Sequence, residues 1–295
     1  MTQHATRTNG DLLAAETGMD AVTLRVGDLS LMSSYYRDAL GLESLSEHGS
    51  SVVLGRGLTP LVVLEHAAGL PAPSRSQAGL FHTALLFDGP AALAATVYQA
   101  SRDRRSSYVG SADHLVSEAF YFTDPEGNGI ELYSDRDRSE WAYRDGHVDM
   151  QTLALDPNRY LREHLPEAGD AAQNGEAKVG HVHLQVGDVA TARAFYVDAL
   201  GFEVTVEIPG ALFVSAGGYH HHMAMNTWNS RGAGPRAASL GLAEVAITVP
   251  TRADLDAVSE RLRHRSLSVQ DDGNQLRVDD PWGTPVTLSV GGASA

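Results

Sequence analysis

The chain of 295 residues is long enough for about two domains of ordinary size, and its apolar fraction of 43% is that of a globular protein. Its formal charge of -15 argues against binding to nucleic acid or to an anionic membrane, and the absence of cysteine leaves only histidine and carboxylate side chains to hold a metal. Because no apolar run approaches the roughly 20 residues of a membrane span and the first ten residues do not resemble a signal peptide, we expect a cytoplasmic protein with a small-molecule partner.

The first unit of the chain reads as one strand, one helix and three more strands. Apolar and polar residues alternate over Val22–Val26, which predicts a strand. A helix follows to about Leu40, with Asp28 or Ser30 as its N-cap and Gly41 as its end. Three short strands are predicted after it, at Glu43–Glu47, Ser51–Leu54 and Pro60–Glu65.

The second unit repeats this order with a different sequence. It starts with an apolar strand at Phe81, continues with an Ala-rich helix from about Ala91, and ends in FYFTDPEGNGIELY. The ending combines a turn, D-P-E-G, with a final strand that carries Glu131.

The third unit copies the first. The stretch AVTLRVGDLSLMSSYYRDALGL from Ala21 aligns without a gap with HVHLQVGDVATARAFYVDALGF from His181. In the third unit the predicted elements are a strand, a helix to Leu200, and three strands: His181–Val186, Glu203–Glu207, Gly210–Ser215 and Tyr219–Thr227. Most shared residues need only be core positions and turn glycines.

The fourth unit copies the second, with a strand AEVAITV, a helix at Ala253–Arg263 and the ending VDDPWGTPVTLSV. Superposing the two endings aligns Glu131 with Thr287, and superposing the opening strands aligns His82 with Glu244. Each unit is thus a βαβββ module, and the fold class is α+β. We expect an N-terminal extension (1–18), a first domain of two modules (19–134), a connector (135–177) and a second domain of two modules (178–292).

These modules, the V-G-D signature with its tyrosine and D-A-L-G, and the ending D-P-E-G-N-G-I-E-L-Y resemble the vicinal oxygen chelate superfamily. That superfamily includes glyoxalase I, bleomycin- and fosfomycin-resistance proteins and extradiol ring-cleaving dioxygenases. The resemblance implies two tandem domains whose sheets form open β-cups. It also implies that metal ligands come from the first and last strands of modules.

At those ligand positions the four modules differ. The first-strand position is Ala21 in module one, His82 in module two, His181 in module three and Glu244 in module four, and Glu131 occupies the last strand of module two. Two histidines and a carboxylate are the facial triad of non-heme Fe(II) oxygenases. We therefore expect one Fe(II) site, with Mn(II) as an alternative, at His82, Glu131 and His181, where module two faces module three.

The resemblance also implies three catalytic residues. Tyr121 lies ten residues before Glu131 and His114 seven residues before Tyr121, close to the spacing in extradiol enzymes. The remaining acid/base histidine of that family comes from the strand YHHHMAMN. Strand alternation, together with alignment of Asn226 on the ligand position of module one (Glu65), favours His222, with His221 as the alternative.

The resemblance implies extradiol cleavage of a catechol-type aromatic diol with O2 as co-substrate. Both oxygen atoms would enter the product. Members of this fold often form oligomers, so a homo-oligomer is also compatible with the resemblance. His222 would act as a general acid, and Tyr121 and His114 would hold a substrate oxygen. Two alternatives stay open. One is a redox-neutral, glyoxalase-like isomerase or lyase, which usually needs four protein ligands, and the other is a non-catalytic binding protein. A single histidine in an apolar strand is more often an ordinary core residue than a metal ligand. The prediction of a metal site therefore depends on His82, Glu131 and His181 occurring together at the ligand positions.

Overall fold

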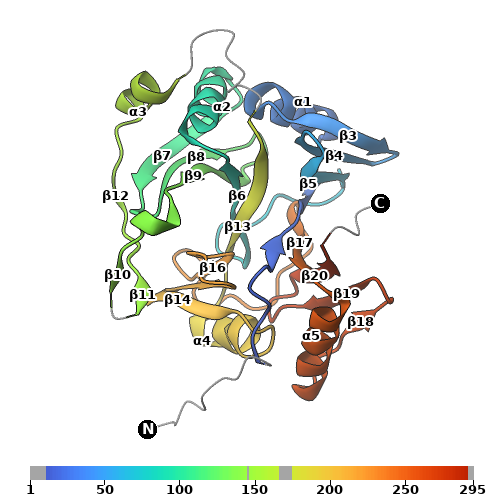
Figure 1. Cartoon of the computed structure of the whole chain (residues 1–295). Helices are drawn as coiled ribbons and strands as arrows, with labels where there is room; N and C mark the ends of the chain where they lie inside the picture. The colour runs from blue at the N-terminus through green and yellow to red at the C-terminus, as the bar shows by residue number, and fades with distance from the viewer. Residues whose placement is uncertain (1–10, 145, 166–174, 292–295) are drawn as a thin grey trace.

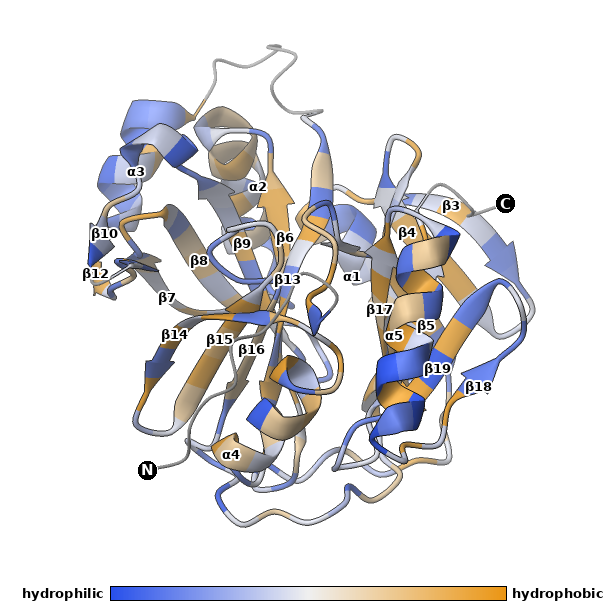
Figure 2. Cartoon of the chain, turned by 60° about the horizontal axis from the view of Figure 1, so that its bottom comes forward, coloured by the Kyte–Doolittle hydropathy of each residue, from blue (hydrophilic) through white to orange (hydrophobic). Residues whose placement is uncertain are grey.

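The computed structural model describes residues 11–144, 146–165 and 175–291, which form two large sheets that lie side by side (Figures 1 and 2). Parts of the expected extension, of the connector and of the end of the second domain lie outside the described residues. The predicted α+β class with open sheets is confirmed. Among the described residues, no helix is long and apolar enough to cross a membrane.

The first sheet joins module one to module four. In the described part of the chain its strand order is β18-β19-β20-β17-β2-β5-β4-β3, with β1 paired to β17. Its strands are β1 (Gly18–Met19), β2 (Val22–Val26), β3 (Glu43–His48), β4 (Ser51–Arg56), β5 (Thr59–His66), β17 (Gly241–Val249), β18 (Gln270–Asp271), β19 (Gln275–Asp279) and β20 (Pro285–Val290).

The second sheet joins module two to module three, as the position of the expected metal site requires. Its order is β12-β7-β8-β9-β6-β13-β16-β15-β14, and antiparallel pairing of β6 with β13 connects the modules at its centre. Its strands are β6 (Gly79–Phe87), β7 (Ser107–Asp113), β8 (Ser117–Thr123), β9 (Gly129–Asp135), β12 (Leu153–Ala154), β13 (Ala177–Gln185), β14 (Glu203–Ile208), β15 (Ala211–Ser215) and β16 (Met223–Asn226). Because each sheet draws one module from each half of the chain, the division into residues 19–134 and 178–292 stays a prediction.

One helix of each module packs against the sheets. They are α1 (Leu29–Leu40), α2 (Pro90–Arg102), α4 (Val189–Ala192) and α5 (Arg252–His264), and α1 lies beside α2 (Figure 1). The cap predicted for α1 is present, because Asp28 accepts from the Leu31 N–H and Gly41 ends the helix with a φ of 66°. The third helix is shorter than predicted, since α4 passes into a π-helical turn at Arg193–Val197.

Two tyrosines explain the strongest part of the repeated signature. Tyr36 on α1 donates a hydrogen bond to Asp124 in the D-P-E-G turn of module two, at 3.1 Å. Tyr196 makes the equivalent bond to Asp280 in the D-P-W-G turn of module four, at 3.0 Å. The tyrosine of one module therefore fixes the turn before the last strand of the next module.

The connector contacts both edges of the second sheet, with β11 (His147–Val148) against β14 and β12 (Leu153–Ala154) against β7. It contains a 3-10 turn (Arg138–Glu140), the hairpin β10 (Tyr143–Arg144) and β11 (His147–Val148), strand β12, and α3 (Pro157–His164). β12 pairs with the edge strand β7.

Candidate metal centre and active site

Three ligand-type side chains converge at the centre of the second sheet. His82 lies on β6, Glu131 on β9 and His181 on β13, and the register places Ala84 opposite both Glu131 and His181. His82 is two residues before Ala84, so it shares the same face of β6. The methyl group of Ala84 thus lies between β9 and β13, on the same face of the sheet as the side chains of Glu131 and His181.

The ligand atoms of the three side chains all lie within 4.8 Å of one another. Glu131 Oε2 lies 2.9 Å from His82 Nε2 and 3.1 Å from His181 Nε2, and all three residues are buried. Burial alone would raise the pKa of the Glu131 carboxyl, but His181 and His82 hold this pKa well below its usual range. Burial lowers the pKa of His181 to about 4, against the opposing charge of Glu131. A carboxylate and a neutral imidazole are the protonation states that bind metals.

The packing of these atoms fits a bound metal ion. His82 Nε2 is buried and, although close to Glu131, has no hydrogen bond of acceptable geometry. Such orphaned polar atoms are rare in protein interiors. Two ligand atoms that bind one metal at right angles, each about 2.1 Å away, lie about 3 Å apart, which is the separation seen here. Among the described residues this is the single cluster of three such ligands.

A bulge and a glycine direct His181 toward this cluster. The register between β6 and β13 shifts between Val179 and His181. A Cβ atom on Gly180 would overlap the hydroxyl of Tyr133, which is buried and bonded to Tyr219 at 2.7 Å. Glycine at position 180 therefore lets the strand pass over Tyr133 and present His181.

The cluster lies at the floor of a cavity of about 630 Å³. Its walls are mainly apolar and aromatic, with contributions from β7, β8, β14, β15 and the connector. They include Phe81, Val109, Met150, Val206, Phe213 and Trp228. No Lys or Arg is present among the described lining residues, so the cavity suits an uncharged, partly aromatic ligand.

Tyr121 and His114 form a hydrogen-bonded pair on one wall. Their Oη and Nε2 atoms are 2.7 Å apart, and His114 Nδ1 lies 2.7 Å from the Gln151 carbonyl of the connector. Because a carbonyl only accepts, His114 donates its Nδ1–H to Gln151, and its Nε2 accepts a hydrogen bond from the Tyr121 hydroxyl. Burial, followed by the nearby charge of Glu131, raises the pKa of Tyr121 well above its usual value, so the phenol stays protonated.

His221, and not His222, lines the cavity. The His221 ring lies 4.0 Å from that of His181, between centroids. His222 instead accepts the Ala216 N–H and packs on Phe202 and Tyr219. The alternation rule that favoured His222 does not apply, because β16 begins only at Met223, four residues later than predicted, and the histidines precede it.

The register also corrects the position of the fourth ligand. β16 pairs in parallel with β13, so that Ala224 lies opposite His183, as Glu131 lies opposite Ala84. Ala224, not Asn226, therefore occupies the place of a last-strand ligand in module three. The Asn226 amide is engaged elsewhere, since it accepts from Trp228 N–H and donates to His183 Nε2 at 2.9 Å.

His183 is a cavity residue that sequence reasoning left without a definite role. It is buried between Phe81, Trp228 and Phe213 and lies directly opposite His82. Its spacing of two from His181 was the signal that it shares the cavity face.

A family model of the glyoxalase/bleomycin resistance protein/dioxygenase superfamily matches residues 18–132 and 178–286. The chain belongs to this superfamily. The two matches cover the module pairs that the repeat defined.

One relative by sequence and two solved structures of similar fold are informative. The chain is 36% identical over 275 residues to catechol-2,3-dioxygenase of Bacillus subtilis (strain 168), covering 90% of this chain and 94% of that protein. It shares its fold with a Bacillus subtilis protein put forward as a dioxygenase (TM-score 0.63, 12% identity, 92% and 84% coverage). Glyoxalase I from Zea mays also has this fold (TM-score 0.58, 17% identity, 93% and 92% coverage).

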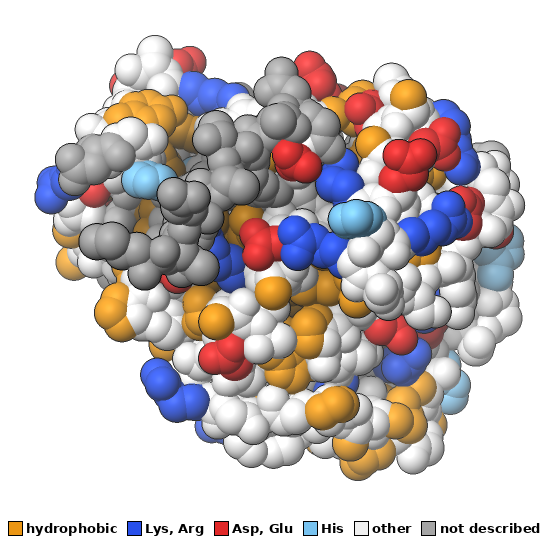
Figure 3. All heavy atoms as spheres, turned by 90° about the horizontal axis from the view of Figure 1, so that it is seen from below, with side chains coloured by type: hydrophobic (Ala, Val, Ile, Leu, Met, Phe, Trp, Pro, Cys, Tyr) orange, Lys and Arg blue, Asp and Glu red, His pale blue; other side chains and the backbone are white. Residues whose placement is uncertain are grey.

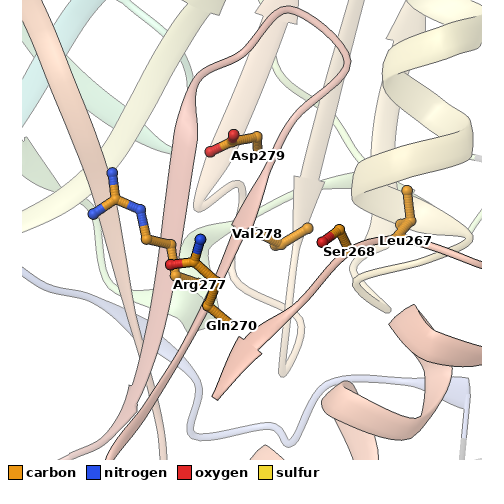
Figure 4. A pocket seen from close by; sticks show the side chains of 6 residues that line it. All are labelled: Leu267, Ser268, Gln270, Arg277, Val278 and Asp279. Carbon is orange, nitrogen blue, oxygen red and sulfur yellow. The ribbon is translucent and has the colours of Figure 1, made fainter. Parts of the chain in front are cut away.

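The other sheet of this superfamily member has no comparable site in its described residues. Glu244, the counterpart of His82, pairs with Arg277 at 3.3 Å, and the counterpart of Glu131 is Thr287. A hollow of about 460 Å³ lies near Arg277, and the residues that line it include no histidine (Figure 4): Leu267, Ser268, Gln270, Arg277, Val278 and Asp279. Modules one and four thus keep the fold without the metal ligands.

Proposed function

We propose that this protein is an Fe(II)-dependent extradiol ring-cleaving dioxygenase that acts on an uncharged catechol-type diol, with Mn(II) as the alternative metal. The observation that carries the proposal is the three-ligand cluster of His82, Glu131 and His181 under an apolar cavity, with Ala224 where a fourth ligand would stand. Three protein ligands leave positions free for a diol and for dioxygen, whereas a glyoxalase-like site usually has four. The relationship over 90% of the chain to a catechol-2,3-dioxygenase supports the same assignment.

His82, Glu131 and His181 would hold the metal, which would supply Lewis-acid activation of the diol and redox chemistry toward dioxygen. The remaining work falls to the cavity residues. Tyr121, which donates its proton to His114, can accept a hydrogen bond from a substrate hydroxyl. His221, on the side of module three, has one ring nitrogen available to exchange a proton with the reacting oxygens. We thus assign to His221 the acid/base role expected of His222.

The cavity walls orient and isolate the substrate. Phe81, Phe213 and Trp228 form an aromatic side on which a planar ring can lie, and Met150 of the connector borders the opening. Exclusion of water strengthens the polar interactions within the site.

The test is anaerobic loading with Fe(II), addition of catechol, 3-methylcatechol or 2,3-dihydroxybiphenyl, and admission of air. We expect oxygen uptake together with a yellow semialdehyde product. His82→Ala and Glu131→Gln should abolish both signals, His221→Phe should slow turnover by about a hundredfold, and Glu244→Gln, at the equivalent position of the other sheet, should change neither. Tight iron binding without oxygen uptake with any of the diols would contradict the proposal.

A further inference from the structure

A hydrogen-bonded chain leads from the end of β9 to the cavity. His220 Nε2 lies 3.0 Å from Asp135 Oδ1, and His220 Nδ1 lies 2.7 Å from His221 Nδ1. His220 is fully buried, with its ring packed against Tyr219 and Trp141. The three residues therefore connect a carboxylate four positions after Glu131 to the histidine that borders the metal cluster.

The chemistry of the donors and acceptors fixes where the protons lie. An ionised carboxylate only accepts, so His220 donates its Nε2–H to Asp135. A neutral imidazole that donates from Nε2 has a bare Nδ1, which accepts. His221 must then donate its Nδ1–H to His220. This leaves the Nε2 of His221, on the far side of the ring from His220, without a proton.

We propose that Asp135 and His220 are positioning residues that hold His221 in its Nδ1–H tautomer, with a bare Nε2 available to the reacting diol. The proposal builds on the function assigned above. Asp135 acts through His220 and does not itself contact the cavity, since neither residue is among the cavity lining.

The other sheet offers an internal comparison. By the strand registers, Asp135 corresponds to Gly291 in module four. His220 and His221 precede β16, and the matching segment of module one, residues 55–61 before the β2–β5 pairing, contains no histidine. That sheet forms without a carboxylate or an imidazole at these places. The chain of hydrogen bonds is thus present in the sheet that carries the metal ligands and is dispensable for building the module pair.

The tautomers can be measured in the metal-free protein. Histidine labelled with ¹⁵N gives different long-range ¹H–¹⁵N correlations for Nδ1–H and Nε2–H rings, and His220→Gln and His221→Gln assign the two signals. We expect Nε2–H for His220 and Nδ1–H for His221. In Asp135→Ala the His221 signal should shift toward a mixture of tautomers, whereas Asp135→Asn, which retains an acceptor oxygen, should keep the wild-type pattern. Glu118→Gln, a neighbouring carboxylate paired with Arg136, is the matched control.

Kinetics of the iron-loaded protein supply the second readout. Asp135→Ala should lower kcat by about ten- to a hundredfold, with KM within about twofold of wild type, and Asp135→Asn should restore most of the loss. An Nε2–H tautomer of His221 in the wild-type protein would overturn the proposal, and so would an unchanged kcat in Asp135→Ala. The spectra can be recorded without turnover. Absence of dioxygenase activity would therefore contradict the proposed function, whereas the tautomer assignment would still be tested by the spectra alone.

Discussion

Ala84 lies opposite two of the three ligand-type side chains in the second sheet. Its methyl group lies between Glu131 and His181 in the strand register. A larger side chain there would occupy the space in which the ligand atoms meet.

We expect Ala84→Val to weaken metal binding about tenfold or more while the fold persists, because displacement of residues that orient metal ligands has effects of this size. Anaerobic titration with Fe(II) or Co(II) measures the affinity. Ala246→Val is the matched control, since Ala246 lies opposite Thr287 in the other sheet. Equal affinities in the two variants would show that Ala84 does not shape the site.

His222 gives a prediction for acid stability. Burial lowers its pKa in the folded protein to about 3, whereas an exposed histidine has a pKa near 6.5. Between these two pH values the unfolded chain binds a proton that the folded protein does not. The free energy of unfolding should therefore fall as the pH drops from about 6.5 toward 3, by up to about 1.4 kcal/mol per pH unit from this residue.

The measurement is urea unfolding of the metal-free protein at a series of pH values. His222→Gln should flatten the dependence below pH 6.5. The same slope in wild type and variant would mean that His222 is not the group responsible.

At the scale of elements, the two tyrosine–aspartate bonds join consecutive modules. Both tyrosines are buried, and Asp124 also accepts from Asn128 and from two backbone N–H groups. Burial raises the pKa of Asp124 to about 6, against these hydrogen bonds, so the carboxylate is ionised above that pH. A hydrogen bond to a buried charge contributes about 1.5–3 kcal/mol.

Tyr36→Phe and Tyr196→Phe should each lower the free energy of unfolding by about 1.5–3 kcal/mol at pH 8, because each leaves a buried carboxylate with one donor fewer. Denaturant unfolding checks both values. Tyr35→Phe is the control, since Tyr35 bonds the neutral hydroxyl of Ser106 and should cost about 1 kcal/mol. A Tyr36 effect no larger than that of Tyr35 would contradict this role.

The sequence predicted the modules and the ligand positions more accurately than the bounds of individual strands. The repeat located all four modules, and the residue types at equivalent positions pointed to His82, Glu131 and His181, because a duplicated strand keeps its place in the fold. The start of β16 was predicted four residues too early, since a run of three histidines carries no signal for where a ladder begins. The structure places His221, and not His222, at the cavity. Asn226 does align with Glu65, but the counterpart of Glu131 is Ala224, because this correspondence depends on strand register, which tertiary pairing fixes.

At the scale of the whole molecule, two module pairs of the same fold differ in the residues that they carry. The sheet of modules two and three carries the ligands, the cavity and the connector, and the sheet of modules one and four lacks them. Acidic and basic side chains are interspersed on the face shown in Figure 3, so no continuous basic surface for a polyanion appears there. This agrees with a small-molecule partner.

We therefore expect one tightly bound metal ion per chain. Elemental analysis after reconstitution and desalting measures the ratio, and Glu131→Gln should lower it to near zero. Two tightly bound ions per chain would show that the second sheet also holds a site.

We propose that the protein, with a metal at its ligand cluster, inserts both atoms of dioxygen into an opened diol ring. The most direct test is turnover of catechol under ¹⁸O2 with mass analysis of the product. Incorporation of two labelled atoms into a semialdehyde, lost in His82→Ala, is the predicted result. A product without label, or an intact ring after oxygen uptake, would contradict the account.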